Sequence, residues 1–174
     1  NPCDTNRFNS LHAIQTVGYY KVGGPKAAIE LLNFMIKQCT DIYEYIDERA
    51  GYYVEIEDYL KALDDYNFLY EKRWVHFYGH VEFSLAYCYS KLNKNVEAIQ
   101  FYNKAIDAKH NEIDKVYVNR GNCKYELNDY RGALSDYNKA IYKKSSVRYT
   151  ELCNYKGRAK YFLKDYAGAL ADLT

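Results

Sequence analysis

The sequence predicts an all-α protein in which antiparallel pairs of helices stack one after another as an α-solenoid. Three observations lead to this fold class. A pattern of small and apolar residues recurs in steps of 34 to 36 residues, a period that indicates a structural repeat. Inside each copy the apolar residues follow helical spacing. The 174 residues include only 2 prolines and 9 glycines, so little in the chain interrupts helices.

A recurring alanine anchors the repeat. The anchors are Ala28, Ala62, Ala98, Ala133 and Ala169. Three other columns keep the same register: residues four positions after the anchor (Leu32, Tyr66, Tyr102, Tyr137), seven positions after it (Met35, Leu69, Ala105, Ala140) and twelve positions before it (Thr16, Ala50, Ala86, Gly121, Gly157). Spacings of 4 and 7 place residues on one face of a helix, whereas the residue twelve positions earlier belongs to a different helix.

A short polar break separates the two helices of each copy. The breaks are the Gly-Gly pair at 23–24 and the segments 55–58, 92–95, 127–129 and 163–165. Pro25 follows the first break and suits the first turn of a helix, where its missing N–H is not needed. Asp129 ends the fourth break, and we expect its side chain to cap the next helix. Each copy is therefore predicted to be a helix, a tight turn and a second helix.

Along the chain, the predicted repeats are 9–42, 43–78, 79–113, 114–149 and 150–174, the last one incomplete. Because the chain begins at Asn1 and stops inside a predicted helix, we expect a fragment or processed form of a longer protein. In the fourth repeat, the small residues Gly121 and Ala133 would let the two helices approach closely. A bulkier residue there is expected to overpack the contact, at about 1–3 kcal/mol.

These columns resemble the tetratricopeptide repeat. That family carries aromatic and small residues in its first helix and an Ala–x3–aromatic–x2–Ala pattern in its second, with a period of about 34 residues. The fourth copy matches with Tyr117 and Gly121 in the first helix, then Ala133, Tyr137 and Ala140 in the second. The resemblance implies a single array over residues 1–174, with about five repeats wound into a right-handed solenoid that has a concave groove.

In this family the first helix of each repeat lines the groove, so the resemblance also implies which side chains contact a partner. The candidates are Phe83, Tyr87, Lys115, Asn122, Tyr125, Asn154, Arg158 and Tyr161. Tyr and Arg are favoured anchors at interfaces, and Asn can bond to an extended peptide backbone. Packing is the alternative role for each tyrosine, because many of the 22 tyrosines fill packing columns.

The implied function is a protein–protein interaction module, a scaffold that binds a peptide or a helix of a partner protein in the groove. The alternative is a structural or regulatory segment of a larger protein, which packs on another domain or associates with itself. The incomplete last repeat favours a homo-oligomer, because the open apolar end of a solenoid can accept a further repeat or a second copy.

No motif indicates catalysis, a cofactor or a metal. The glycines form no phosphate-binding or dinucleotide-binding loop, and the nucleophile motif G-x-S-x-G does not occur. His76 and His80 are four residues apart, but two ligands do not complete a metal site. We therefore expect no enzyme activity, no cofactor and no bound metal.

Charge and cysteine content limit the partners and the compartment. Residues 41–71 carry ten acidic side chains against two basic ones, and residues 72–174 carry eighteen basic against eleven acidic. Neither part is basic enough to predict nucleic-acid binding. No apolar run approaches the ~18 residues of a membrane span, so membrane insertion is not expected. The five cysteines form no CxxC pair, which is typical of a reduced chain and favours the cytoplasm.

Overall fold

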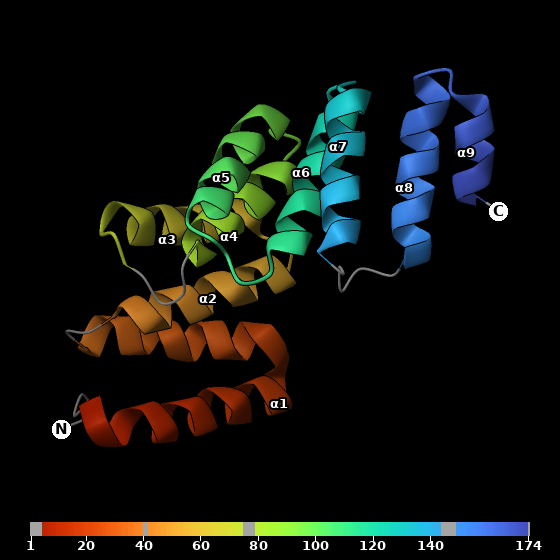
Figure 1. The fold of residues 1–174 in the computed structure, drawn as a ribbon. Coiled ribbons are helices and arrows are strands. Elements are labelled where there is room, and N and C mark those ends of the chain that lie inside the picture. The colour runs from red at the N-terminus through yellow and green to blue at the C-terminus, as the bar shows by residue number, and fades with distance from the viewer. Residues whose placement is uncertain (1–4, 40–41, 75–78, 144–148, 174) are drawn as a thin grey trace. The chain divides into compact units, whose positions relative to one another are not determined.

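The structure is a computed structural model that describes residues 5–39, 42–74, 79–143 and 149–173. Within these ranges every regular element is a helix (Figure 1). The helices are α1 (Thr5–Gln38), α2 (Tyr43–Glu55), α3 (Tyr59–Glu71), α4 (His80–Lys91), α5 (Asn95–Asp107), α6 (Ile113–Glu126), α7 (Tyr130–Tyr142), α8 (Tyr149–Phe162) and α9 (Tyr166–Leu173). The chain divides into two compact units, Asn1–Trp74 and Val75–Thr174.

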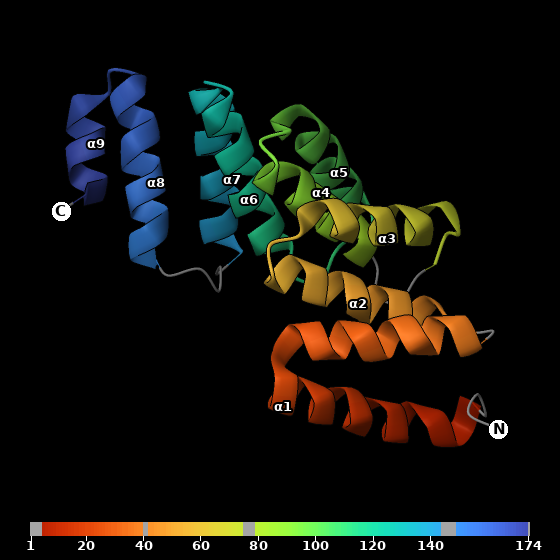
Figure 2. The ribbon, with the colours of Figure 1, turned by 180° about the vertical axis from the view of Figure 1, so that it is seen from behind.

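Helix α1 bends sharply and consists of two helices joined at Gly24. This glycine has a φ of 69° and a ψ of −165°, a conformation that is not helical and that favours glycine. Pro25 follows at once and begins the second helix, which its fixed φ suits. The two parts of α1 run back along each other (Figures 1 and 2). The predicted break at 23–24 is therefore confirmed.

Helices that follow each other in sequence pack as antiparallel pairs. In the first unit α1 packs on α2 and α2 on α3. In the second unit the pairs are α4–α5, α6–α7 and α8–α9, and the packing of α5 on α6 and of α7 on α8 joins them. The predicted all-α fold of consecutive helix pairs is confirmed. In the part of the chain that is described, no helix is both long and apolar enough to cross a lipid bilayer.

The columns that define the repeat in the sequence form the core of the structure. All the anchor alanines are at most 4% exposed. Four positions after each of the first four anchors, Leu32, Tyr66, Tyr102 and Tyr137 are also buried. Tyr102 and Tyr137 are the largest fully buried side chains among the described residues. Each belongs to a core cluster that joins its own helical pair to the first helix of the next pair. The periodic pattern therefore identifies packing positions.

Gly121 makes room for a side chain of the paired helix. A Cβ atom at Gly121 would lie 2.6 Å from Cε1 of Tyr137. The ring of Tyr137, rather than the expected Ala133, therefore supplies the nearest atoms. The last pair repeats this arrangement, because a Cβ atom at Gly157 would lie 2.7 Å from Cγ of Leu173. In both pairs a glycine on the first helix accommodates a large side chain from the second.

Aspartates cap the second helix of three pairs. Oδ1 of Asp129 accepts a hydrogen bond from the backbone N–H of Gly132 at 2.9 Å, so the predicted cap is confirmed. Asp58 and Asp165 cap α3 and α9 in the same way. Lys94 occupies the corresponding position before α5 and supplies no side-chain cap. An aspartate cap therefore stabilises the start of the second helix in three pairs, whereas the pair α4–α5 has no such cap.

Candidate functional site

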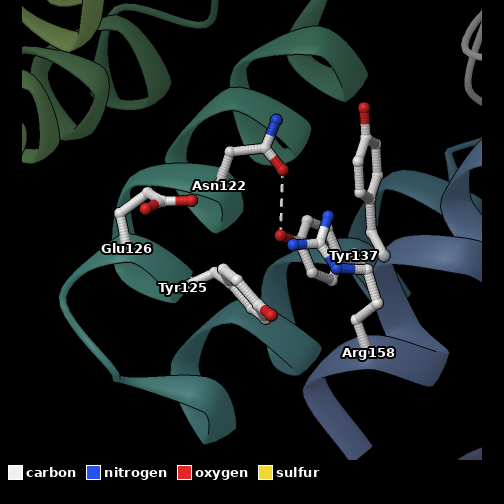
Figure 3. Close-up of a pocket in the computed structure, with 6 residues that line it drawn as sticks. Asn122, Tyr125, Glu126, Tyr137 and Arg158 are labelled. Carbon is white, nitrogen blue, oxygen red and sulfur yellow. Dashed lines mark hydrogen bonds between the residues drawn. The ribbon is translucent and has the colours of Figure 1, made fainter. Parts of the chain in front are cut away.

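A pocket of about 220 Å³ opens between α6 and α8, the first helices of the last two pairs (Figure 3). Its walls come from three helices of the second unit. The lining residues are Asn122, Tyr125 and Glu126 from α6, Tyr137 from α7, and Tyr155 and Arg158 from α8. The two first helices contact each other directly, which brings their side chains to one site.

Helical spacing explains why these side chains meet. Tyr125 and Glu126 follow Asn122 by three and four positions, so both lie on the same side of α6 as Asn122. Tyr155 and Arg158 are three positions apart and share a face of α8 in the same way. Tyr137 reaches the pocket from the paired helix α7 and is 1% exposed. It forms the floor of the pocket, and the residues of α6 and α8 form its walls.

A hydrogen bond between Tyr137 and Asn122 joins the core to the pocket. The hydroxyl of Tyr137 donates to Oδ1 of Asn122 at 2.9 Å (Figure 3). Burial raises the pKa of Tyr137, so its hydroxyl keeps the proton and remains a donor. The amide nitrogen of Asn122 lies on the side away from Tyr137 (Figure 3). Asn122 therefore uses its carbonyl internally and keeps its N–H groups for donation.

Arg158 brings a positive charge to the pocket. Its Cζ atom lies 4.9 Å from the centroid of the Tyr125 ring, within the range of a cation–π interaction. Tyr130 and Phe162 brace that ring edge-on, with centroids 5.3 Å and 5.9 Å away. Among the residues that the structure describes, no carboxylate forms an ion pair with Arg158. The exposed guanidinium therefore lies against the ring of Tyr125 without an ion-pair partner among the described residues.

Aromatic rings form much of the remaining wall. Tyr155 stacks on Tyr137 with a centroid distance of 5.6 Å and an angle of 25° between the rings. Of the six lining residues, Glu126 is the only acidic one, and it is exposed at the edge of the pocket. The pocket therefore combines flat apolar surfaces with several hydrogen-bond donors, one cation and one carboxylate at the rim.

Three of the side chains predicted from the sequence meet in this pocket, namely Asn122, Tyr125 and Arg158. Two predicted residues lie on α4. Phe83 packs against the core of its own pair and stacks on the ring of His110, with centroids 4.9 Å apart. Tyr87 is half-buried beneath the ammonium of Lys91. The structure therefore gives these two aromatic residues intramolecular contacts, and their role toward a partner stays a prediction.

The other three predicted residues lie near the surface of the second unit. Lys115 forms an ion pair with Glu112, one turn earlier on the chain. Asn154 is exposed on α8 and does not line the pocket. Tyr161 is 58% exposed and makes edge-on contacts with Phe162 and Tyr166. Their contribution to binding also stays a prediction.

Sequence reasoning missed Glu126, Tyr137 and Tyr155. Tyr137 stands in a packing column of the repeat and packs there, and it also lines the pocket and bonds to Asn122 through its hydroxyl. Glu126 follows Asn122 by one helical turn, and Tyr155 precedes Arg158 by three positions. A search for neighbours on the same helix face would have found both.

Metal ligation has no candidate cluster in the described ranges, where no three or more His, Cys, Asp or Glu side chains are grouped to hold an ion. Of the two histidines considered from the sequence, His80 lies on α4, whereas His76 falls outside the described residues.

Stacked helix pairs, with a pocket between successive first helices, define an α-helical repeat protein. Residues 83–111 and 114–142 each match the sequence profile of the tetratricopeptide repeat. The chain therefore contains two repeats of the tetratricopeptide family, within an array of helical pairs. This family generally supplies protein–protein interaction modules and is typically non-catalytic.

Solved structures with the same architecture support the fold. MamA from Desulfovibrio magneticus RS-1 is similar with a TM-score of 0.80 and 13% identity, over 94% of this chain and 89% of that one. BtubC (BKLC) from P. vanneervenii is similar with a TM-score of 0.79 and 15% identity, over 96% and 77%. A tetratricopeptide repeat protein from Parabacteroides merdae has a TM-score of 0.73 and 18% identity, over 97% and 64%. At these identities the similarity establishes the fold alone. The sequence matches none of the curated proteins compared with it.

Proposed function

We propose that this chain is a protein-binding module that holds a peptide or a helix of a partner protein in the groove lined by the first helices of its repeats. The observation that supports this is the pocket between α6 and α8. Asn122, Tyr125 and Arg158 come from two different helices, and all three line this pocket. The resemblance to the tetratricopeptide repeat implies the same three residues for the groove. A concave site with rigid aromatic walls and an arginine has the composition of an interface hot spot.

The remaining predicted groove residues extend this proposed surface along the first helices of the second unit. They are Lys115 on α6, Asn154 and Tyr161 on α8, and Phe83 and Tyr87 on α4. A partner that lies across these helices would contact several of them at once. The proposed activity is binding, and it includes no catalytic step, cofactor or metal.

Site-specific photo-crosslinking tests which face binds. A photoreactive amino acid replaces Asn154, which is exposed on the first helix α8, or Asn138, which is exposed on the second helix α7. After irradiation in lysate of the native host, we expect a crosslinked polypeptide from position 154 and little from position 138. Addition of Arg158→Ala should weaken the crosslink from position 154. Equal crosslinking from both positions, or crosslinking only from position 138, would contradict a groove site.

Self-association is the second candidate function, and one observation favours it. Leu173 occupies the column of Tyr102 and Tyr137, which are at most 1% exposed, yet Leu173 is 55% exposed. Leu170 and Tyr166 on the same helix are 65% and 59% exposed. Sedimentation velocity over a range of concentrations should detect a dimer that Leu170→Lys abolishes. A monomer at every concentration would exclude this function for the chain.

A further inference from the structure

The pocket offers hydrogen-bond donors from Asn122 and Arg158, on two neighbouring helices. Asn122 can donate from its amide nitrogen, but its carbonyl already accepts from Tyr137. A side-chain amide with both groups free can bond to the C=O and the N–H of a peptide backbone together. Here one acceptor position of the carbonyl oxygen is already used by Tyr137, whereas the amide nitrogen can still donate to a ligand oxygen.

Arg158 adds charge to this set of donors. The guanidinium carries five N–H donors and no acceptor. It lies against the ring of Tyr125, which Tyr130 and Phe162 contact edge-on, and this contact favours one orientation of the side chain. A planar guanidinium held in this way matches the two oxygens of a carboxylate, with two parallel N–H···O bonds.

We propose that this pocket binds the carboxylate of an Asp or Glu side chain within the partner polypeptide. The inference rests on the proposed function and gives the chemistry of the partner. Arg158 would pair with the carboxylate, the amide of Asn122 would donate to one of its oxygens, and the rings of Tyr125 and Tyr155 would flank the aliphatic part of the side chain.

The charge of the second unit favours an acidic partner. Residues 75–174 carry sixteen Lys and Arg against eleven Asp and Glu. Such an excess attracts an acidic polypeptide over distances of about one Debye length. The direct contacts of α6 with α4 and with α8 align three first helices. A polypeptide crossing them continues past the pocket on both sides, so a side chain, and not the chain terminus, would enter.

Glu126 opposes the binding of a carboxylate in this pocket. Its carboxylate is exposed at the rim and repels a second carboxylate nearby. Neutralising Glu126 should therefore tighten binding, whereas neutralising Arg158 should weaken it. Opposite effects from two residues of the same pocket distinguish local recognition from general charge attraction.

NMR titration of the full 174-residue chain tests the proposal with defined probes. The probes are a nine-residue Glu–Ala alternating peptide with an acetylated N-terminus and an amidated C-terminus, the same peptide with Gln for Glu, and the Gln peptide with a free C-terminal carboxylate. The readout is the chemical shift of the side-chain N–H groups of Arg158 and Asn122, with the dissociation constant from the titration curve.

We expect the Glu peptide to shift both groups and to bind at least about tenfold more tightly than the Gln peptide. Arg158→Gln should weaken the Glu peptide by about tenfold or more, and Glu126→Gln should tighten it by a few fold. Arg131→Gln removes the same charge from an exposed residue of α7 outside the pocket and should have less than about a twofold effect. Circular dichroism checks that each variant is folded.

Three outcomes would overturn the proposal. Equal binding of the Glu and Gln peptides would exclude carboxylate recognition. Equal weakening of Glu-peptide binding by Arg158→Gln and Arg131→Gln would mean that general charge attraction, and not the pocket, binds the peptide. Tighter binding of the Gln peptide with the free terminus would transfer recognition to a C-terminal carboxylate. If the crosslinking experiment fails while the Glu peptide binds as described, the proposed function fails and the carboxylate site remains. If crosslinking succeeds and the peptides do not discriminate, only the present inference fails.

Discussion

Arg120 on α6 and Asp136 on α7 form an ion pair with two parallel hydrogen bonds, from Nε at 2.8 Å and from Nη2 at 2.6 Å. Asp136 is fully buried, and Lys124 also reaches its carboxylate at 2.8 Å. The same geometry joins Arg49 to Asp65 in the pair α2–α3. Both arginines also donate to an asparagine of the preceding helix (Asn33 and Asn103). The network therefore links the helices within a pair and the pair to its neighbour.

Removal of Asp136 should destabilise the chain strongly. In Asp136→Ala two cations lose their partner while Arg120 remains mostly buried, and breaking a buried pair in this way costs about 3–5 kcal/mol. The free energy of unfolding from urea denaturation, followed by circular dichroism, measures the loss. An effect below about 1 kcal/mol would mean that solvent already screens this pair.

The pair α4–α5 carries apolar and aromatic residues where the pair α6–α7 carries the ion-pair network. Leu85, Tyr89 and Phe101 occupy the positions of Arg120, Lys124 and Asp136, thirty-five residues earlier, and Tyr89 stacks on Phe101 with centroids 5.5 Å apart. The triple variant Arg120→Leu, Lys124→Tyr, Asp136→Phe should stay within about 1.5 kcal/mol of the parent chain, because a packed apolar set can replace a buried ion pair. A loss as large as that of Asp136→Ala would mean that the polar network itself is required.

Gly121→Ala should destabilise the fourth pair. The new methyl group would lie 2.6 Å from the ring of Tyr137, and overpacking of this kind costs about 1–3 kcal/mol. Gly51→Ala is the control, because a Cβ atom there meets nothing within 4 Å. Since alanine is the better helix former, the control should gain about 0.5–1 kcal/mol in urea denaturation. Equal effects of the two variants would refute the close contact.

Lys94→Asp should stabilise α5. Lys94 has a φ of −87° and a ψ of 64°, close to the −80° and 68° of the capping residue Asp129. An aspartate in that conformation can accept the backbone hydrogen bond that Lys94 leaves unmade, which is worth about 0.5–2 kcal/mol. The melting temperature of Lys94→Asp should rise, whereas that of Asp129→Ala should fall. Lys94→Asn controls for the change of charge and should retain part of the gain.

Acid should weaken the second unit through His110. Burial lowers the pKa of His110 below its usual value near 6.5, and the charge on His80 acts in the same direction, while Glu112 opposes both. Nδ1 of His110 accepts a hydrogen bond from the backbone N–H of Glu112 at 3.1 Å, which the protonated ring cannot do. Because the unfolded chain takes up the proton first, stability should fall as the pH drops below about 6.5.

Urea midpoints at pH 7.5, 6.5 and 5.5 measure this dependence. His110→Gln retains an acceptor for Glu112 but does not titrate, so its midpoint should change less over this range. An unchanged slope in His110→Gln would assign the acid sensitivity to other groups.

The helical pairs were predictable because the sequence repeats its packing columns. The anchor alanines, the residues four positions later and the polar breaks each recur at a fixed separation, and fixed separations reveal helix faces. The Arg120–Asp136 network was not predictable in this way. Its positions hold a basic residue and Asp in three pairs (Arg49 and Asp65, Arg120 and Asp136, Lys156 and Asp172), but Leu85 and Phe101 in another. The sequence pattern of apolar and small residues does not show that these charged side chains pair between two helices.

The candidate site was predictable in part. Asn122, Tyr125 and Arg158 stand at positions that the resemblance to the tetratricopeptide repeat implies for the groove, and all three line the pocket. Phe83 and Tyr87 fit the same rule, but the structure surrounds them with their own neighbours, namely His110 and Lys91. The sequence could not show that the hydroxyl of Tyr137 donates a hydrogen bond to the carbonyl of Asn122. That bond depends on how far the buried tyrosine extends from α7 toward α6.

The hydrogen bond between Tyr137 and Asn122 sets the orientation of the Asn122 amide in the pocket, so this orientation depends on only two residues. Tyr102 in the third pair corresponds to Tyr137, but Tyr87 stands where Asn122 would be. A Tyr87→Asn exchange would therefore place the same pair, a buried tyrosine and an asparagine, one repeat earlier. An array of this kind can thus acquire a second donor site, or lose the one it has, through a single codon and with its packing columns intact.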